Sequence, residues 1–193
     1  MLESLVPGDI SDELQQKASE TARKLIEELA TIEDSERGHA ERVAVYSVAI
    51  GQSLGFDVPR LTNLRYAAYL HDIGFIKLPE GGKWMDHADL GANLLSKKLM
   101  FAHLAEFVRS HHENMDGTGY PSGISGDEIP LESRIIRVAE SFDTLTHSRG
   151  WNHPVSEDEA ISRLKLQSGQ LFDKAVVQAL VRVLPKIIPM NEF

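Results

Sequence analysis

The stretch from residue 111 to residue 121 reads HHENMDGTGYP and differs in character from the sequence around it. Two adjacent histidines open it, and an acidic, glycine-rich run ending in Tyr120-Pro121 follows. A helical pattern covers residues 101–112, whereas the Gly and Pro residues that come next oppose regular structure. Long loops inside compact domains are usually functional or disordered. We therefore expect a helix that ends in two histidines and leads into a functional loop.

The segments on both sides of this loop also have apolar side chains at helical spacing. The expected helices cover residues 11–31, 36–54, 59–73, 87–95, 101–112, 131–148, 157–167 and 173–184. Pro59 suits the first turn of its helix, and Gly55 and Gly74 are expected to end the helices before them. No segment has a convincing strand pattern. The sequence therefore predicts an all-α protein, built as a single-domain helical bundle.

Length and composition limit the function further. The 193 residues suffice for one domain with a substantial core, and the formal net charge is −9. An acidic chain is a poor binder of duplex nucleic acid. There is no Cys, no signal-like N-terminus and no apolar run of roughly 18 residues that could cross a membrane. These features favour a cytoplasmic protein that does not bind membranes.

Histidines and carboxylates near the expected helix ends carry the candidate chemistry. The residues concerned are His39, His71, Asp72, His87, His111, His112 and Glu140. Imidazole and carboxylate without sulfur suit Fe, Mn, Ni, Co or Zn better than Ca or Mg. One aspartate can bridge two ions through its two oxygens, so we expect Asp72 at the centre of a dinuclear site. Each residue alone has an ordinary alternative as a helix cap or a core histidine.

The order of the motifs resembles the HD-GYP family, a branch of the HD-superfamily of metal-dependent phosphohydrolases. The resemblance covers about residues 33–184, and residues 1–32 then form an N-terminal helix for support or dimerisation. The matching motifs are His39 with Arg42-Val43, His71-Asp72-Ile73-Gly74, His87 with Gly91, residues 111–121, and Arg134-Ile135-Ile136 leading to Glu140 and Asp143.

The resemblance implies an all-helical domain with two or three metal ions, usually iron or manganese. It also implies hydrolysis of cyclic di-GMP to pGpG and often GMP. The seven histidines and carboxylates named above are then the expected ligands, and Asp72 is the expected catalytic residue beside a metal-activated hydroxide. Tyr120 and Arg149 are expected to contact the substrate.

Further residues have supporting roles in this hypothesis. Gly117 and Gly119 would let the loop backbone approach the ligand, and Lys77 would be a nearby cation. Asp116 and Asp143 are expected to orient histidines or loop amides, with capping or loop bracing as an equal alternative. Trp84 and Trp151 flank the expected pocket loops, where an aromatic residue serves a core or an interface more often than it stacks on guanine.

Several positions depart from the family pattern. Phe75 replaces a Lys that faces the substrate phosphate, and Asn152 replaces a further cation. Glu140 replaces the last metal-binding Asp, and Ser35 replaces a Glu that supports a third ion, which favours two ions. The loop between Asp72 and His87 is also short.

These departures keep alternatives to the phosphodiesterase hypothesis open. One is a catalytically weak or inactive receptor for cyclic di-GMP or a protein-docking module. The other is an HD phosphohydrolase that acts on another nucleotide. The resemblance also raises two assembly hypotheses, a homodimer formed through residues 11–31 and a signalling protein as partner.

Overall fold

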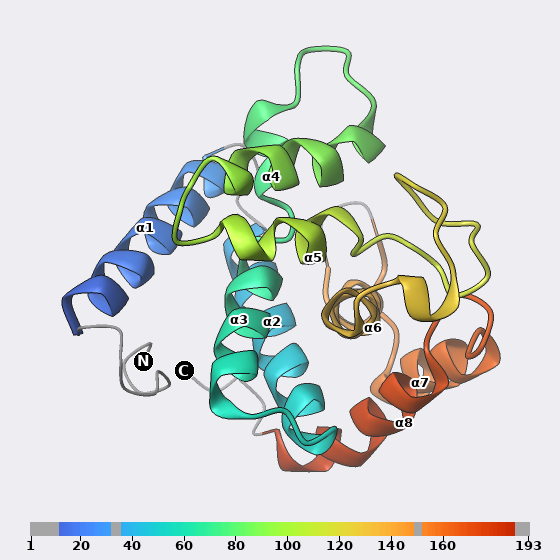
Figure 1. The fold of residues 1–193 in the computed structure, drawn as a ribbon. Helices are drawn as coiled ribbons and strands as arrows, with labels where there is room; N and C mark the ends of the chain where they lie inside the picture. Colours follow the sequence, from blue (N-terminus) through green and yellow to red (C-terminus); the bar gives the residue numbers. More distant parts are fainter. Residues whose placement is uncertain (1–11, 32–35, 149–151, 188–193) are drawn as a thin grey trace.

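The computed structural model describes residues 12–31, 36–148 and 152–187 (Figure 1). Its α-helices are α1 (Asp12–Ala30), α2 (Glu36–Ser53), α3 (Val58–Tyr69), α4 (His87–Ser96), α5 (Ala105–Arg109), α6 (Leu131–Thr146), α7 (Glu157–Leu166) and α8 (Lys174–Val183). The 3₁₀ helices are η1 (Ile73–Lys77), η2 (Trp84–Asp86), η3 (Ala102–Leu104), η4 (Gly126–Glu128) and η5 (Leu184–Lys186). Within these ranges there is no β-strand, which confirms the all-α prediction.

Helix α2 is the central element of the fold. It packs against α3, α6 and α8, while α4 packs on α5 and on η1 (Figure 1). Helix α1 adds Ala22, Leu25, Ile26 and Leu29 to the same continuous core of buried apolar side chains. Helix α1 therefore packs on the bundle. None of the described helices is both long and apolar enough to cross a membrane.

Two helices end earlier than the sequence predicts, and both ends carry histidines. Helix α3 begins after the N-cap Asp57, whose side chain accepts a hydrogen bond from the Arg60 amide, and it ends at Tyr69 rather than at Gly74. The segment 101–112 is not one helix, because η3 and the short α5 divide it and α5 ends at Arg109. His71-Asp72 and His111-His112 consequently lie in turns that follow α3 and α5.

Close backbone packing explains why the chain turns before Gly74. A Cβ atom on Gly74 would lie 1.8 Å from the carbonyl oxygen of His87 and 2.5 Å from the amide nitrogen of Gly91. Only glycine allows η1 to approach α4 this closely. This contact joins the turn that holds Asp72 to the first residue of α4.

Candidate metal centre

Side chains from four segments meet in the interior of the bundle. His39 comes from α2, His71 and Asp72 from the turn after α3, His87 from the start of α4, and His111 and His112 from the turn after α5. All six are buried. They form two groups in which the possible ligand atoms lie within 4.8 Å of one another, and Asp72 belongs to both groups.

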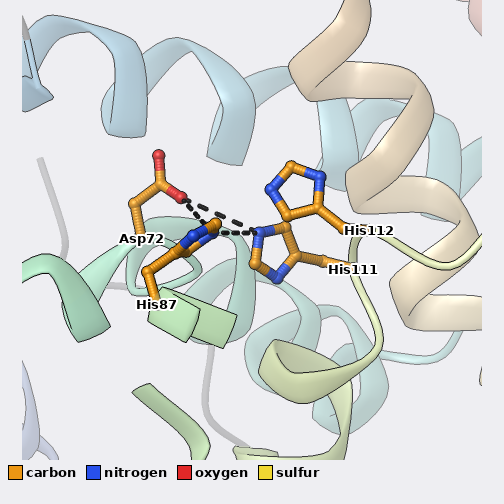
Figure 2. Close-up of side chains that lie close together, drawn as sticks. All are labelled: Asp72, His87, His111 and His112. Atoms are coloured by element: carbon orange, nitrogen blue, oxygen red, sulfur yellow. Dashed lines mark hydrogen bonds and ion pairs between the residues drawn. The ribbon is translucent and has the colours of Figure 1, made fainter. Parts of the chain in front are cut away.

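The two carboxylate oxygens of Asp72 face different histidines. Oδ2 lies 3.2 Å from His71 Nε2 and 3.9 Å from His39 Nε2. Oδ1 lies 3.3 Å from His87 Nε2 and 3.7 Å from His111 Nε2, and Figure 2 shows these two rings turned toward Asp72. This is the arrangement expected of a carboxylate that bridges two adjacent ions.

The other ring nitrogen of each of these histidines is held by an oxygen atom. Nδ1 of His71, His87 and His111 lies 2.7, 2.7 and 2.5 Å from the carbonyl oxygen three residues earlier in the chain. A carbonyl only accepts hydrogen bonds, so Nδ1 carries a proton in each of these rings and Nε2 is the nitrogen that faces the centre. His39 Nδ1 makes the equivalent contact with Asp143 Oδ2 at 2.7 Å.

The distances between these Nε2 atoms are compatible with bound metal ions. The Nε2 atoms of His39 and His71 are 3.3 Å apart, and so are those of His87 and His111. Two nitrogens that bind one ion at about 2.0–2.1 Å come to a similar separation. His112 Nε2 and Glu140 Oε2 are buried and have no hydrogen-bond partner, as expected of atoms that would coordinate a metal ion. The residues present therefore fit a metal centre.

The electrostatics of the cluster agree with this fit. Burial opposes ionisation of Asp72, but the neighbouring histidines outweigh it and hold the pKa of its carboxyl well below 3.8. Burial would lower the pKa of His71, yet the Asp72 charge raises it to about 9. Burial lowers the pKa values of His111 and His112, which keeps both rings neutral. The ionised Asp72 carboxylate therefore attracts positive charge, either a proton on His71 or a metal ion that displaces this proton, while His111 and His112 are neutral.

Glu140 on α6 lies at the edge of this cluster and outside both groups. Its Oε2 atom is 3.8 Å from His112 Nδ1 and 3.8 Å from Arg137 Nη1. Arg137 Nη2 also donates to Asn114 Oδ1 at 3.4 Å. Of the seven expected ligands, Glu140 is thus the one that lies outside both groups.

Asp143 is fully buried and joins α6 to α2. It accepts hydrogen bonds from Arg42 Nε at 2.5 Å and Nη2 at 3.0 Å, and it contacts the rings of His39 and His147. Burial would raise the pKa of Asp143, but hydrogen bonds from His147, His39 and Arg42 hold it far below 3.8. This geometry supports an orienting role for Asp143 and places His147 against Asp143, which in turn contacts His39.

The loop after His112 folds back onto the centre. The Glu113 carboxylate accepts hydrogen bonds from the Ser122 amide at 2.7 Å and from the Gly123 amide at 3.1 Å. The Tyr120 ring stacks on His112, with centroids 4.7 Å apart, and its buried hydroxyl has no hydrogen-bond partner. Burial raises the pKa of Tyr120, so the hydroxyl remains a proton donor.

Two glycines and Asp116 shape the same loop. Gly117 has a φ of 78°, a conformation that favours glycine. A Cβ on Gly119 would lie 2.4 Å from the Asn114 amide nitrogen, so this glycine lets the loop pack on residues 112–114. The exposed Asp116 side chain accepts hydrogen bonds from the amide and hydroxyl of Thr118, and the Asp116 backbone amide donates to the Gln170 carbonyl oxygen at 2.9 Å. Its contacts are those of a loop brace.

Phe75 and Asn152, two positions that depart from the family pattern, both contact described residues. Phe75 stacks on His87, with centroids 4.3 Å apart and planes at 10°. Lys77 is exposed at the end of η1 and makes no described polar contact with the cluster. The Asn152 amide donates to the carbonyl oxygens of Thr144 and His147 and so closes the end of α6. Arg149, Trp151 and Ser35 lie outside the described residues.

Sequence reasoning did not assign functions to several residues that contact the site. Arg42 lies one helical turn after His39, and Glu113 directly follows the histidine pair, so position alone could have suggested both. The Phe75 ring had no such signal, because its contact with His87 depends on how η1 packs against α4.

This chain is similar in sequence to known proteins. The HD domain family matches residues 80–176. The chain is 31% identical to the cyclic di-GMP phosphodiesterase response regulator RpfG of Xanthomonas campestris, an alignment that covers 89% of this chain and 49% of the relative. It is 33% identical to a cyclic di-GMP phosphodiesterase of Thermotoga maritima, covering 75% of this chain and 44% of the relative. The chain therefore spans about half the length of the curated relatives it matches.

Solved structures give the same fold. Bd1817, an HDG"Y"P protein from Bdellovibrio bacteriovorus, superposes with a TM-score of 0.65 at 24% identity, covering 78% of this chain and 52% of that chain. A further sequence relative is the 3'3'-cGAMP-specific phosphodiesterase 3 of Vibrio cholerae. It is 37% identical to this chain, in an alignment that covers 76% of this chain and 35% of the relative. The resemblance seen in the motifs is confirmed.

Proposed function

This chain belongs to the HD domain family, and from that premise we propose that it hydrolyses the phosphodiester bonds of cyclic di-GMP to pGpG or GMP with two divalent metal ions. The observation that carries the proposal is the division of the Asp72 carboxylate between two pairs of histidines. Relatives named cyclic di-GMP phosphodiesterases support the choice of substrate.

Each side chain has a specific task in this proposal. His39, His71 and Asp72 Oδ2 would hold one ion, while His87, His111, His112 and Asp72 Oδ1 would hold the other, with Glu140 completing the set. Bound divalent ions lower the pKa of a coordinated water and neutralise charge on phosphate oxygens. The Tyr120 hydroxyl, which keeps its proton and lacks a hydrogen-bond partner, would donate to an anionic oxygen of the substrate. Arg149 supplies a further substrate contact.

Other features of the proposal rest on ligand chemistry and on the family resemblance. Iron or manganese suits the imidazole and carboxylate set, with Ni, Co or Zn as alternatives. We place the protein in the cytoplasm and propose a signalling protein as its partner. A homodimer through the N-terminal helix would use the exposed side of α1, because Leu25, Ile26 and Leu29 are buried in the core.

Reconstitution of the purified protein tests this function. We expect about two ions per chain after anaerobic loading with Fe(II) or Mn(II), and conversion of cyclic di-GMP to pGpG or GMP on chromatography. Asp72→Asn should lose both properties, whereas Glu159→Gln, on the exposed face of α7, should keep them. Absence of turnover with either metal under reducing conditions would count against the proposal. Parallel assays with 3'3'-cGAMP and other nucleotides test the choice of substrate.

A receptor function is the second candidate, because Phe75 occupies the position of a family cation and lies flat on His87. A preorganised charged donor contributes about 3–4 kcal/mol to a transition state, so its absence can leave binding without efficient hydrolysis. Calorimetry that detects tight cyclic di-GMP binding without product would favour this candidate.

The variant Phe75→Lys separates the two candidates. If the missing cation limits hydrolysis, the variant should raise kcat for cyclic di-GMP by about 10-fold or more, because a Lys can neutralise phosphate charge. Loss of the Phe75 stack should lower the melting temperature at the same time. An unchanged kcat with intact metal content would show that the cation is not what limits turnover. Met85→Lys, on exposed η2, is the matched control for an added charge.

A further inference from the structure

The Trp84 side chain lies at the edge of the metal centre and is open to solvent. Its exposed fraction is 56%, although tryptophan is usually well covered in folded proteins. Single exposed apolar side chains are common, so exposure alone indicates nothing. The position of this indole among the side chains of the centre is what suggests a function.

Four rings surround the indole, and three of them belong to the candidate site. The Trp84 ring centroid lies 5.0 Å from that of His87, 5.4 Å from that of His112 and 6.1 Å from that of Tyr120. Phe75 completes the set at 6.0 Å. These contacts fix one side of the indole against the residues that hold the centre, while more than half of its surface stays open.

The backbone at this position is also fixed. The Trp84 carbonyl oxygen accepts the hydrogen bond from His87 Nδ1 at 2.7 Å, and η2 runs directly into α4. The indole is therefore held rigidly relative to a histidine of the centre. Stacking of a ligand on this ring would cost the protein little additional conformational entropy. Because the bond to His87 uses the backbone, a change of the Trp84 side chain leaves that bond in place.

We propose that the open face of the Trp84 indole is a stacking platform for a purine base of the cyclic dinucleotide, beside the metal centre that takes the phosphate. This inference rests on the proposed function and adds the residue that recognises the base. Stacking on an aromatic ring needs no positive charge from the protein. This suits a chain whose net charge is −9 and in which the Phe75 ring takes the place of a family cation. Every nucleobase has a π-face, so the platform favours base-bearing phosphodiesters over base-free ones.

Steady-state kinetics of the metal-loaded full chain test the platform. Base stacking on an aromatic side chain changes affinity by about 5- to 150-fold, so Trp84→Ala should raise the KM for cyclic di-GMP within that range. The kcat should stay within about two-fold, because the stack is present in both ground and transition states. Trp84→Phe should recover much of the affinity, whereas Trp84→Leu, which is apolar but has no π-face, should not.

Two controls separate base recognition from damage to the centre. Met85→Ala removes the neighbouring exposed side chain of η2 and should leave KM unchanged. Inorganic phosphate binds metal without a base, so its inhibition constant should be the same in the parent protein and in Trp84→Ala. A parallel loss of phosphate inhibition would mean that the indole acts through the metal centre, and it would overturn the platform.

The outcomes distinguish failure of the platform from failure of the proposed function. A parent protein that hydrolyses cyclic di-GMP, together with an unchanged KM in Trp84→Ala, overturns the platform alone. A parent that binds without turnover moves the test to calorimetry, where Trp84→Ala must weaken binding of cyclic di-GMP by the same factor. A metal-loaded parent that neither binds nor hydrolyses cyclic di-GMP, 3'3'-cGAMP or pGpG overturns both.

Discussion

Three histidines of the centre are oriented by the same local device, a bond from Nδ1 to the carbonyl oxygen three residues earlier. For His71 and His111 these carbonyls lie at the ends of α3 and α5, where the last turn leaves carbonyl groups without helical partners. The ring satisfies the carbonyl, and the carbonyl fixes the ring. Where each helix ends therefore decides which nitrogen faces the metal centre.

Asp143 orients His39 from another helix, and its removal should loosen the centre. In Asp143→Asn, Arg42 would lose its buried counter-charge and His39 its charged partner. Breaking a buried ion pair costs about 3–5 kcal/mol, and loss of such an orienting partner lowers metal affinity by about 10- to 100-fold. Urea unfolding measures the first effect and metal titration the second.

The matched control is an ion pair on the surface. Glu159→Gln breaks the exposed pair with Arg163 on α7, which contributes at most about 1 kcal/mol. Full metal affinity in Asp143→Asn would mean that the Asp143 contact with His39 is not needed to orient that ring.

The residues of the centre could be proposed from sequence because they belong to short motifs in a fixed order. Their partner atoms could not. Arg42 contacts Asp143 only because α2 packs on α6, and Glu113 meets the Ser122 amide only because the loop folds back. Such contacts depend on tertiary packing, which local patterns do not encode.

At the scale of secondary-structure elements, the close backbone contact between η1 and α4 helps to position the centre. A Cβ on Gly74 would overlap the His87 carbonyl oxygen, and backbone atoms cannot move aside as a side chain can. Gly74→Ala should therefore separate η1 from α4 and move His87 relative to Asp72. Overpacking of this kind costs about 1–3 kcal/mol or more, and we expect metal binding to fall with stability.

Gly81→Ala is the control for this prediction. Gly81 lies between η1 and η2 with a φ of 75°, and no atom would contact its added Cβ within 4 Å. The substitution costs about 1–2 kcal/mol of backbone strain but leaves the η1–α4 contact intact. Thermal unfolding and elemental analysis of both variants separate general destabilisation from displacement of His87. Equal metal content in the two variants would contradict the proposed displacement.

Helix positions followed from the sequence more readily than helix ends. Within the described residues, apolar spacing located each α-helix, yet the spacing continued past the true ends of α3 and α5. Both helices stop because a tertiary requirement takes over: His71 and His111 turn inward, and Gly74 packs on α4. Periodicity reports which face is buried, and it does not report where a side chain bonds back to the backbone.

For the whole molecule, the centre ties together segments that are distant in the chain. Its residues run from His39 on α2 to Glu140 on α6, and the core that surrounds them also includes α1. The all-α class could be predicted because each helix carries its own pattern. The packing of α1 onto α2 could not, because an amphipathic helix has the same pattern whether it covers its own core or that of a second chain.

Because the centre links so many helices, bound metal should stabilise the entire bundle. An ion at 100 times its dissociation constant adds about 2.7 kcal/mol to a folded state that binds it at one site. For a chain of this size each kcal/mol raises the melting temperature by about 2–4 °C, so loading one site should raise it by about 5–11 °C over chelator-treated protein.

Asp72→Asn tests whether this stabilisation comes from the shared centre. Asp72 faces both histidine pairs, so its loss should remove most of the metal-dependent rise, whereas Asp116→Asn, in the exposed loop, should retain it. Differential scanning calorimetry with and without chelator measures each shift. An equal rise in both variants would place the stabilising metal elsewhere on this acidic chain, because adventitious binding does not depend on one buried carboxylate. Loss of the rise in Asp72→Asn alone would identify the shared carboxylate as the link between metal binding and folding.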